Sequence, residues 1–201
     1  MSSIIGHGLI IINRYFIMEL KIVYSNIPLT NEKLEAVVVF VTEDSDLLGS
    51  GLRALPGALK KNLSTSLKLR VFTGKKGKSQ HLFSGYAKIP QILAVGLGKK
   101  DELDTETLRR AAGKAGKKLT ALKANTVGFV VTSLLQDAVE TDAGLVLAEG
   151  LTLGAYEFNA YKKTDNEKST ESGLKYFIIY RFRKSSADIC AKSLSKGITQ
   201  T

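Results

Sequence analysis

The sequence is poor in the residues that usually build metal centres and disulfides. Its 201 residues include one cysteine, two histidines, three prolines and no tryptophan. The single cysteine, Cys190, excludes an internal disulfide and a zinc site made from several cysteines. His7 and His81 have no Asp, Glu or Cys neighbour at metal-ligand spacing, and no serine or cysteine can be matched to a base. The residues by themselves therefore indicate no metal site and no nucleophilic hydrolase.

The sequence also lacks a hydrophobic run long enough to cross a bilayer. The apolar stretch at residues 4–12 is too short, no basic region precedes it, and no small-residue cleavage site follows it. We therefore expect no signal peptide, no membrane contact and a cytoplasmic location. Met18 begins a string that is typical of a natural start leading into a first strand. This pattern divides the chain into an N-terminal extension of undetermined role, residues 1–17, and one domain, residues 18–201.

Residues 47–100 contain no aspartate or glutamate. They hold eleven lysines and arginines, more than the formal net charge of +10, so the remainder of the chain is close to neutral. Such a segment attracts phosphates in a salt-dependent, sequence-independent way. The alternatives are a solvated surface and a face that docks on an acidic partner domain. Aromatic residues are few here, which gives little support for stacking on single-stranded nucleic acid. The candidate anion or nucleic-acid contacts are Lys60, Lys61, Lys68, Arg70, Lys75, Lys76, Lys78, Lys99 and Lys100.

The stretch from Pro90 to Leu122 organises the predicted fold. It begins with a buried strand at residues 92–95, continues through a glycine turn at residues 96–98, and ends in a long amphipathic helix. Asp104 or Thr105 is the predicted N-cap of this helix. A strand that leads into a helix in this way is half of a βαβ unit, so we expect a partly parallel sheet. The apolar face of the helix comprises Leu108, Ala111, Ala112, Ala115, Leu119 and Leu122.

The remaining pattern alternates strands with helices. Together these elements predict an α/β sandwich with a mixed β-sheet. In the second long helix, Gly150 and Gly154 would allow close packing on the sheet, and Glu140 and Asp142 are interpreted as solvated helix charges. Further strands are predicted at residues 20–24, 36–41, 67–72, 80–85, 125–132 and 175–181, helices within 48–61 and at 137–156 and 186–194, and a polar loop at 162–172.

Two glycine-containing strings resemble nucleotide-binding motifs only in part. Gly77-Lys78-Ser79 matches the end of a phosphate-binding loop, but Phe72 occupies the position of its first glycine, so a hairpin turn is favoured. Gly96-Leu97-Gly98 follows a strand as a dinucleotide fingerprint does, but Asp101 occupies the third glycine position. A strand-to-loop turn is therefore favoured there.

Two other strings, taken in order, resemble a known family. Residues 95–103, followed by 107–113, are similar to the N-terminal domain of the M17 leucyl aminopeptidases, also called cytosol aminopeptidases. Residues 149–162 resemble the end of that domain, and Phe72-Thr73-Gly74-Lys75 fits a third family element. The resemblance runs from about Met18 to the C-terminus. It implies a macro-domain-like three-layer sandwich, with a mixed β-sheet flanked by helices.

The resemblance also implies what this chain would lack. In the family, a C-terminal catalytic domain removes N-terminal amino acids from peptides with two divalent metals (zinc, manganese or magnesium), held by a lysine and several carboxylates. Neither family string that carries these ligands occurs here, and at Thr141-Asp142-Ala143 the metal-binding glutamate is replaced by Gly144. No catalytic or metal residue can be transferred to this chain, and we expect it to hold no cofactor.

The sequence thus predicts a non-catalytic N-terminal domain, from a truncated or split gene, that acts as an interaction or regulatory module. Its expected partner is a separately encoded M17 catalytic domain, and an oligomer is expected only together with that catalytic half. Two alternatives stay open. The basic segment 47–100 could bind DNA, or the macro-like fold could hold a nucleotide-type ligand near Gly96-Leu97-Gly98.

Overall fold

The computed structural model describes residues 6–11, 17–24, 33–44, 55–131, 142–155 and 176–181, together with Leu29, Leu135 and Val139. The loop predicted at 162–172 and the helix predicted at 186–194 lie outside these residues.

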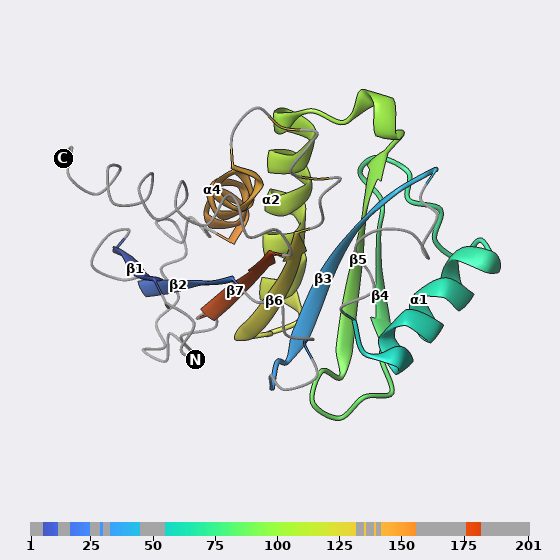
Figure 1. Cartoon of the computed structure of the whole chain (residues 1–201), viewed down its shortest axis with the longest axis horizontal. Coiled ribbons are helices and arrows are strands. Elements are labelled where there is room, and N and C mark those ends of the chain that lie inside the picture. The colour runs from blue at the N-terminus through green and yellow to red at the C-terminus, as the bar shows by residue number, and fades with distance from the viewer. Residues whose placement is uncertain are drawn as a thin grey trace, which may run out of the picture.

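In the described part of the chain, seven strands form a mixed sheet at the centre of the molecule (Figure 1). The strand order is β1-β2-β7-β6-β3-β5-β4, and the five inner strands run parallel to one another. The edge strands β1 and β4 are antiparallel to β2 and β5. The bounds are β1 Gly6–Ile11, β2 Ile17–Tyr24, β3 Ala36–Thr42, β4 Ser79–Phe83, β5 Gln91–Gly98, β6 Thr126–Val131 and β7 Tyr176–Arg181.

Helices cover both faces of this sheet. Helix α1 (Gly57–Lys68) lies on one face, and α2 (Thr105–Ala121) and α4 (Ala143–Ala155) lie on the other (Figure 1). A short 3₁₀ turn, η3 (Lys100–Glu102), connects β5 to α2. Alternate residues of β3 belong to two separate apolar clusters, because successive side chains of a strand point to opposite faces. The predicted α/β three-layer sandwich with a mixed sheet is therefore confirmed.

Helix α2 forms as its sequence predicts. The Asp104 side chain caps it by accepting a hydrogen bond of 2.7 Å from the backbone N–H of Thr107. The apolar face is buried, with Leu108, Ala112 and Leu119 fully covered. The predicted N-cap at Asp104 and the predicted buried face of this helix are both confirmed.

The strand predicted at residues 67–72 is wrong. Helix α1 continues to Lys68, and the chain then turns at Arg70, which has a left-handed φ of 55°. The alternating apolar side chains that suggested a strand are largely solvent-exposed, at 70% for Leu69 and 59% for Val71. The Ser66 carbonyl at the end of α1 accepts the N–H groups of Val71 and Phe72, so these donors are not left for a sheet. Strand β4 pairs with β5 and not with residues 67–72, as the predicted hairpin would require.

Helix α4 begins six residues later than the sequence predicted. It starts at Ala143, and the Asp142 carboxylate accepts hydrogen bonds from the N–H groups of Gly144 (2.8 Å) and Leu145 (3.2 Å). Asp142 is only 8% exposed, so it is a buried N-terminal cap rather than a solvated helix charge. The physical reason is that a short acidic side chain satisfies the orphan N–H groups of a first turn.

The two helices on the same face are in backbone contact through glycines. A Cβ atom added at Gly150 or Gly154 would fall well inside 3.0 Å of the Arg109 carbonyl or the Gly113 carbonyl of α2. These glycines therefore pack on a neighbouring helix and not, as predicted, on the sheet. Their periodicity indicated a close approach correctly, but the sequence pattern does not identify the partner.

We predict that Gly150→Ala destabilises the protein by about 1–3 kcal/mol, because the added methyl group meets backbone that cannot move aside easily. Urea unfolding of the two proteins measures this difference. Gly57→Ala is the matched control, since a Cβ there has nothing within 4 Å and the substitution favours a helix. Equal stability of the Gly150 variant and the parent would contradict the contact.

Candidate functional site

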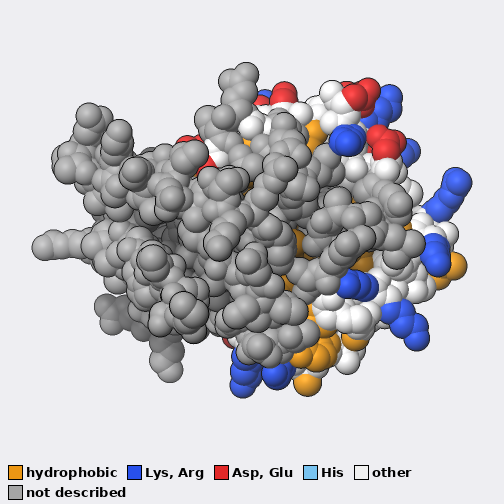
Figure 2. Space-filling model, in the orientation of Figure 1, with side chains coloured by type: hydrophobic (Ala, Val, Ile, Leu, Met, Phe, Trp, Pro, Cys, Tyr) orange, Lys and Arg blue, Asp and Glu red, His pale blue; other side chains and the backbone are white. Residues whose placement is uncertain are grey.

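The structure divides the predicted basic residues into two groups. Lys60, Lys61, Lys68 and Arg70 lie on α1 or in the turn that follows it, on one face of the sheet. The second group surrounds the carboxyl end of β5 and comprises Lys75, Lys76, Lys78, Lys99 and Lys100, all of them exposed. On the face shown in Figure 2, the blue Lys and Arg side chains are spaced apart, and red carboxylates lie among them at one end. On this face, the described basic side chains therefore do not form one continuous positive patch.

Residues 74–78, here called the lysine turn, pack directly on the glycine end of β5. The turn is closed by a hydrogen bond of 3.0 Å from Lys78 N to the Lys75 carbonyl. Gly96 must lack a side chain, because a Cβ there would overlap the Lys75 carbonyl. On its outer side, the Lys114 ammonium of α2 contacts the Gly77 carbonyl. A turn that includes Gly77 and Lys78 is thus present as the sequence predicted, but it packs on β5 and is not the turn of a hairpin between residues 67–72 and β4.

Gly96 and Gly98, which the lysine turn covers, have no backbone N–H group left for a phosphate ligand. Gly96 and Gly98 are the last part of β5, so the predicted strand-to-loop turn at residues 96–98 is wrong. The Gly96 N–H donates to the Lys78 carbonyl (2.8 Å), and the Gly98 N–H donates to the Gly74 carbonyl (2.9 Å). A phosphate cradle works through backbone N–H groups that point at the ligand. At these two positions the donors are already used by the lysine turn.

Carboxylates from outside residues 47–100 fold back against the second basic group. The Glu102 carboxylate lies 3.6 Å from the Lys99 ammonium, and the Asp44 carboxylate accepts from the Lys100 backbone N–H at 3.3 Å. The pKa of Asp104 lies below its ordinary value, first because of the hydrogen bonds from Thr107 and also because of the positive charge of Lys76. Sequence reasoning missed this arrangement, although acidic residues at both ends of the acid-free segment were a signal for it.

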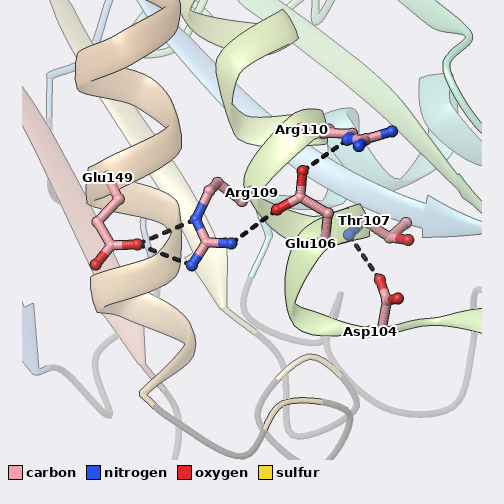
Figure 3. A network of polar contacts seen from close by, with 6 residues as sticks. All are labelled: Asp104, Glu106, Thr107, Arg109, Arg110 and Glu149. Carbon is pink, nitrogen blue, oxygen red and sulfur yellow. Dashed lines mark hydrogen bonds and ion pairs between the residues drawn. The ribbon is translucent and has the colours of Figure 1, made fainter.

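A polar network connects the first turn of α2 to α4 (Figure 3). The Arg109 guanidinium donates to the Glu149 carboxylate through Nε and Nη2, each at 3.1 Å. It also donates to Glu106 at 2.8 Å, and Arg110 donates to the other oxygen of Glu106 at 2.7 Å. Sequence reasoning did not identify this network, because Arg109 and Glu149 are distant in the chain.

Hydrogen bonds within the network shift the pKa values of two of its members, Glu106 and Arg109. Hydrogen bonds from Arg110 and then Arg109 lower the pKa of Glu106 below its ordinary value. Hydrogen bonds to Glu106 and then Glu149 raise the pKa of Arg109. Groups shifted in these directions are poor proton donors and acceptors near neutral pH. The network therefore acts as an electrostatic connection between two helices and does not have the properties of an acid–base pair.

Among the described residues, no group of three or more His, Cys, Asp or Glu side chains is arranged to hold a metal ion. The His81 ring nitrogen Nε2 instead lies 2.9 Å from the Gln91 side-chain oxygen, and its ring packs edge-on against Phe83. Within the same part of the chain, no helix is both long and apolar enough to cross a membrane.

Comparison with solved structures defines the class of fold. An Oceanobacillus iheyensis macrodomain with ADP aligns over 99% of this chain and 100% of the macrodomain, with a TM-score of 0.63 and 15% identity. A mutant of tomato leucine aminopeptidase covers 94% of this chain and 37% of its own, with a TM-score of 0.60 and 14% identity. At such identities the likeness shows the fold alone, which is that of a macrodomain.

Comparison of sequences then places the chain in a family. Residues 38–165 match the model of the cytosol aminopeptidase family, N-terminal domain, so the chain belongs to this family. A probable cytosol aminopeptidase of Streptomyces coelicolor is 34% identical over 71% of this chain, and one of Alkaliphilus oremlandii is 29% identical over 65% of it. The chain spans only 28% and 26% of the length of these two relatives.

We predict that Glu106→Gln reduces the dependence of stability on acid pH. A pKa held below its ordinary value of 4.5 means that the stabilisation is present above that pH and is lost as pH falls through the lower, folded-state pKa. The free energy of unfolding, measured in urea from neutral to acid pH, should therefore fall less steeply for the variant.

Glu102→Gln is the matched control for this experiment. It removes the same charge from an exposed position, but it breaks only the 3.6 Å pair with Lys99. The free energy of unfolding of this control should fall with pH in nearly the same way as that of the parent protein. A Glu106 variant with an unchanged pH profile would show that the network does not contribute to folding.

Proposed function

We propose that this chain is a non-catalytic interaction domain that docks on an M17-type catalytic domain, in the same polypeptide or in another one. The observation that carries this proposal is the family match: residues 38–165 correspond to the N-terminal domain of cytosol aminopeptidases. The relatives extend well beyond this part, since the chain covers 26–28% of their length in the two cases described above.

The geometry of the described residues supports a docking role over a catalytic one. The ionisable groups of the α2–α4 network are engaged with one another, and the backbone donors at Gly96 and Gly98 are engaged with the lysine turn. A domain of this kind can position or shield a neighbouring active site without supplying a reacting group.

In this proposal the whole protein releases N-terminal amino acids from peptides, and the chemistry belongs to the catalytic domain with its two divalent metals. The present domain restricts access to that active site, and oligomer formation depends on the catalytic half. The relatives are described as cytosol aminopeptidases. We accordingly place the protein in the cytoplasm.

We predict that the purified chain, supplied with manganese, does not hydrolyse leucine p-nitroanilide above a metal-free control. An M17 catalytic domain from the same genome should hydrolyse it, and should elute together with the present chain in size-exclusion chromatography. A macrodomain from outside the family is the control, because it shares the fold but not the family surface. Hydrolysis by the chain alone, or separate elution of the two proteins, would contradict the proposal.

DNA binding is the second candidate function. It is favoured by the exposed lysines that gather at the carboxyl end of β5, among them Lys75, Lys76 and Lys78. It is opposed by the carboxylates of Asp44 and Glu102 beside them. A duplex held by phosphate contacts alone would bind without sequence preference.

We predict weak, strongly salt-dependent binding of a labelled DNA duplex, measured by fluorescence anisotropy between about 50 and 200 mM salt. The double variant K75E/K76E should bind more weakly than K60E/K61E, which changes the net charge equally on helix α1. Affinity that does not fall with salt would exclude a phosphate-driven mode.

A further inference from the structure

Among the described residues, β4 is the last strand of the sheet, and no other strand pairs with its outer edge. Its register on β5 fixes which backbone groups face outward. Lys78 pairs with Gly96 and Ser84 with Pro90 through backbone hydrogen bonds, and these bonds alternate along an antiparallel ladder. Gln80 and Leu82 therefore bond to β5. The N–H and C=O groups of the remaining positions, Ser79, His81 and Phe83, point away from the sheet.

Two of these outward carbonyls are already satisfied. The Asn62 side chain of α1 donates to the Phe83 carbonyl at 2.9 Å, and the Gln80 side chain donates to the His81 carbonyl at 3.1 Å. The N–H groups of Ser79, His81 and Phe83 and the carbonyl of Ser79 have no partner among the described residues. The edge consequently offers three N–H donors, one at every second residue, and one carbonyl acceptor at the beginning of the strand.

The elements that form this edge carry positive charge only, although Asp44, Glu102 and Asp104 lie near the lysines at the carboxyl end of β5. Helix α1, the lysine turn, β4 and β5 contain no carboxylate, since all of them lie within residues 47–100. Lys75, Lys76 and Lys78 are exposed just before β4, and Lys61 is exposed beside Asn62 on α1. Another copy of the same edge would be repelled, because lysines near an edge strand oppose edge-to-edge pairing of like molecules. A segment rich in carboxylates would be attracted.

The edge also offers an apolar contact. The Leu82 side chain packs toward the core beneath α1, and His81 and Phe83 face the other side of the strand. The Phe83 side chain is 74% exposed and lies against the His81 ring, with ring centroids 5.1 Å apart. An aromatic side chain at the end of a strand packs well on a cross-strand neighbour. Phosphates neither make this contact nor donate to the Ser79 carbonyl, so these features favour a peptide over a ligand that is held by phosphate contacts alone.

From this arrangement we propose that the outer edge of β4 binds an acidic peptide segment, in extended conformation, as an added strand of the sheet. The outward N–H groups would hold its backbone, the surrounding lysines would select its carboxylates, and Phe83 would take one of its apolar side chains. This inference goes beyond the docking function proposed above and does not depend on an aminopeptidase partner.

The test uses a fluorescein-labelled peptide of eight alternating glutamates and valines, with blocked ends, and the full chain. We expect saturable binding in fluorescence anisotropy, and slower hydrogen exchange in NMR for the N–H groups of Ser79, His81 and Phe83. The N–H groups of Gln80 and Leu82 are protected already by β5 and should change little. A peptide with prolines in place of the valines cannot form the added ladder and should not bind.

Two protein variants separate the two parts of the proposal. His81→Pro removes one outward N–H and no backbone hydrogen bond to β5, at a position that an edge strand tolerates. Because it also removes the side-chain contact with Gln91, His81→Ala, which loses that contact but keeps the N–H, is its control. K75E/K78E reverses the charge before β4, and K117E/K118E makes the same change in net charge on the exposed side of α2. We expect about tenfold weaker binding for His81→Pro and for K75E/K78E, and a smaller loss for their controls. Circular dichroism checks that each variant is folded.

Several results would overturn the proposal. The first is unchanged hydrogen exchange at Ser79, His81 and Phe83 when the peptide is bound. The second is equal weakening by K117E/K118E, which would indicate a general charge effect. Protection of the β4 edge that rises with protein concentration alone would assign it to a second copy of the chain. Displacement of the peptide by single-stranded DNA whose own affinity is unaffected by His81→Pro would assign the surface to phosphates.

Discussion

The double burial of strand β3 is the constraint on which the rest of the fold depends. All seven of its residues are buried, and its alternate side chains belong to two different apolar clusters. A strand with Val37 on one face and Val38 on the other is stable only if both faces of the sheet are covered by helices. Parallel pairing of β3 with β5 and with β6 follows, because helical crossovers are the connections that place helices on those faces.

The cover on each face is built differently. On the α1 face, large side chains such as Leu59 and Leu63 fill the space above the sheet. On the other face, glycines bring α2 and α4 into backbone contact, and the pair then covers β5, β3 and β6 together. The Arg109–Glu149 ion pair spans the same two helices at the surface. An exposed pair of this kind adds little stability by itself, so the glycine contact determines how closely the helices pack.

Charge in this domain is arranged by folding rather than by composition. The absence of carboxylates from residues 47–100 suggested one strongly positive surface. In the folded chain, Asp44, Glu102 and Asp104 approach the lysines at the carboxyl end of β5, whereas the outer edge formed by α1 and β4 has no carboxylate of its own. The carboxylates that approach this segment therefore lie at the carboxyl end of β5, and the order of residues along the chain does not reveal which of its lysines they meet.

The sequence by itself determined the parts of the fold that depend on local pattern. Continuous β-branched runs such as residues 36–41 place buried strands, and Asp104 with the apolar stripe after it places α2, because capping and periodicity act within one turn or one strand. Only the tertiary structure decided the partners. It shows that Gly150 meets a helix and not the sheet, that Asp142 ends a helix instead of lying within it, and that Leu69 and Val71 face solvent instead of forming a strand. Each of these outcomes depends on which distant backbone lies alongside, and that is set by packing of the whole domain and not by residues adjacent in the chain.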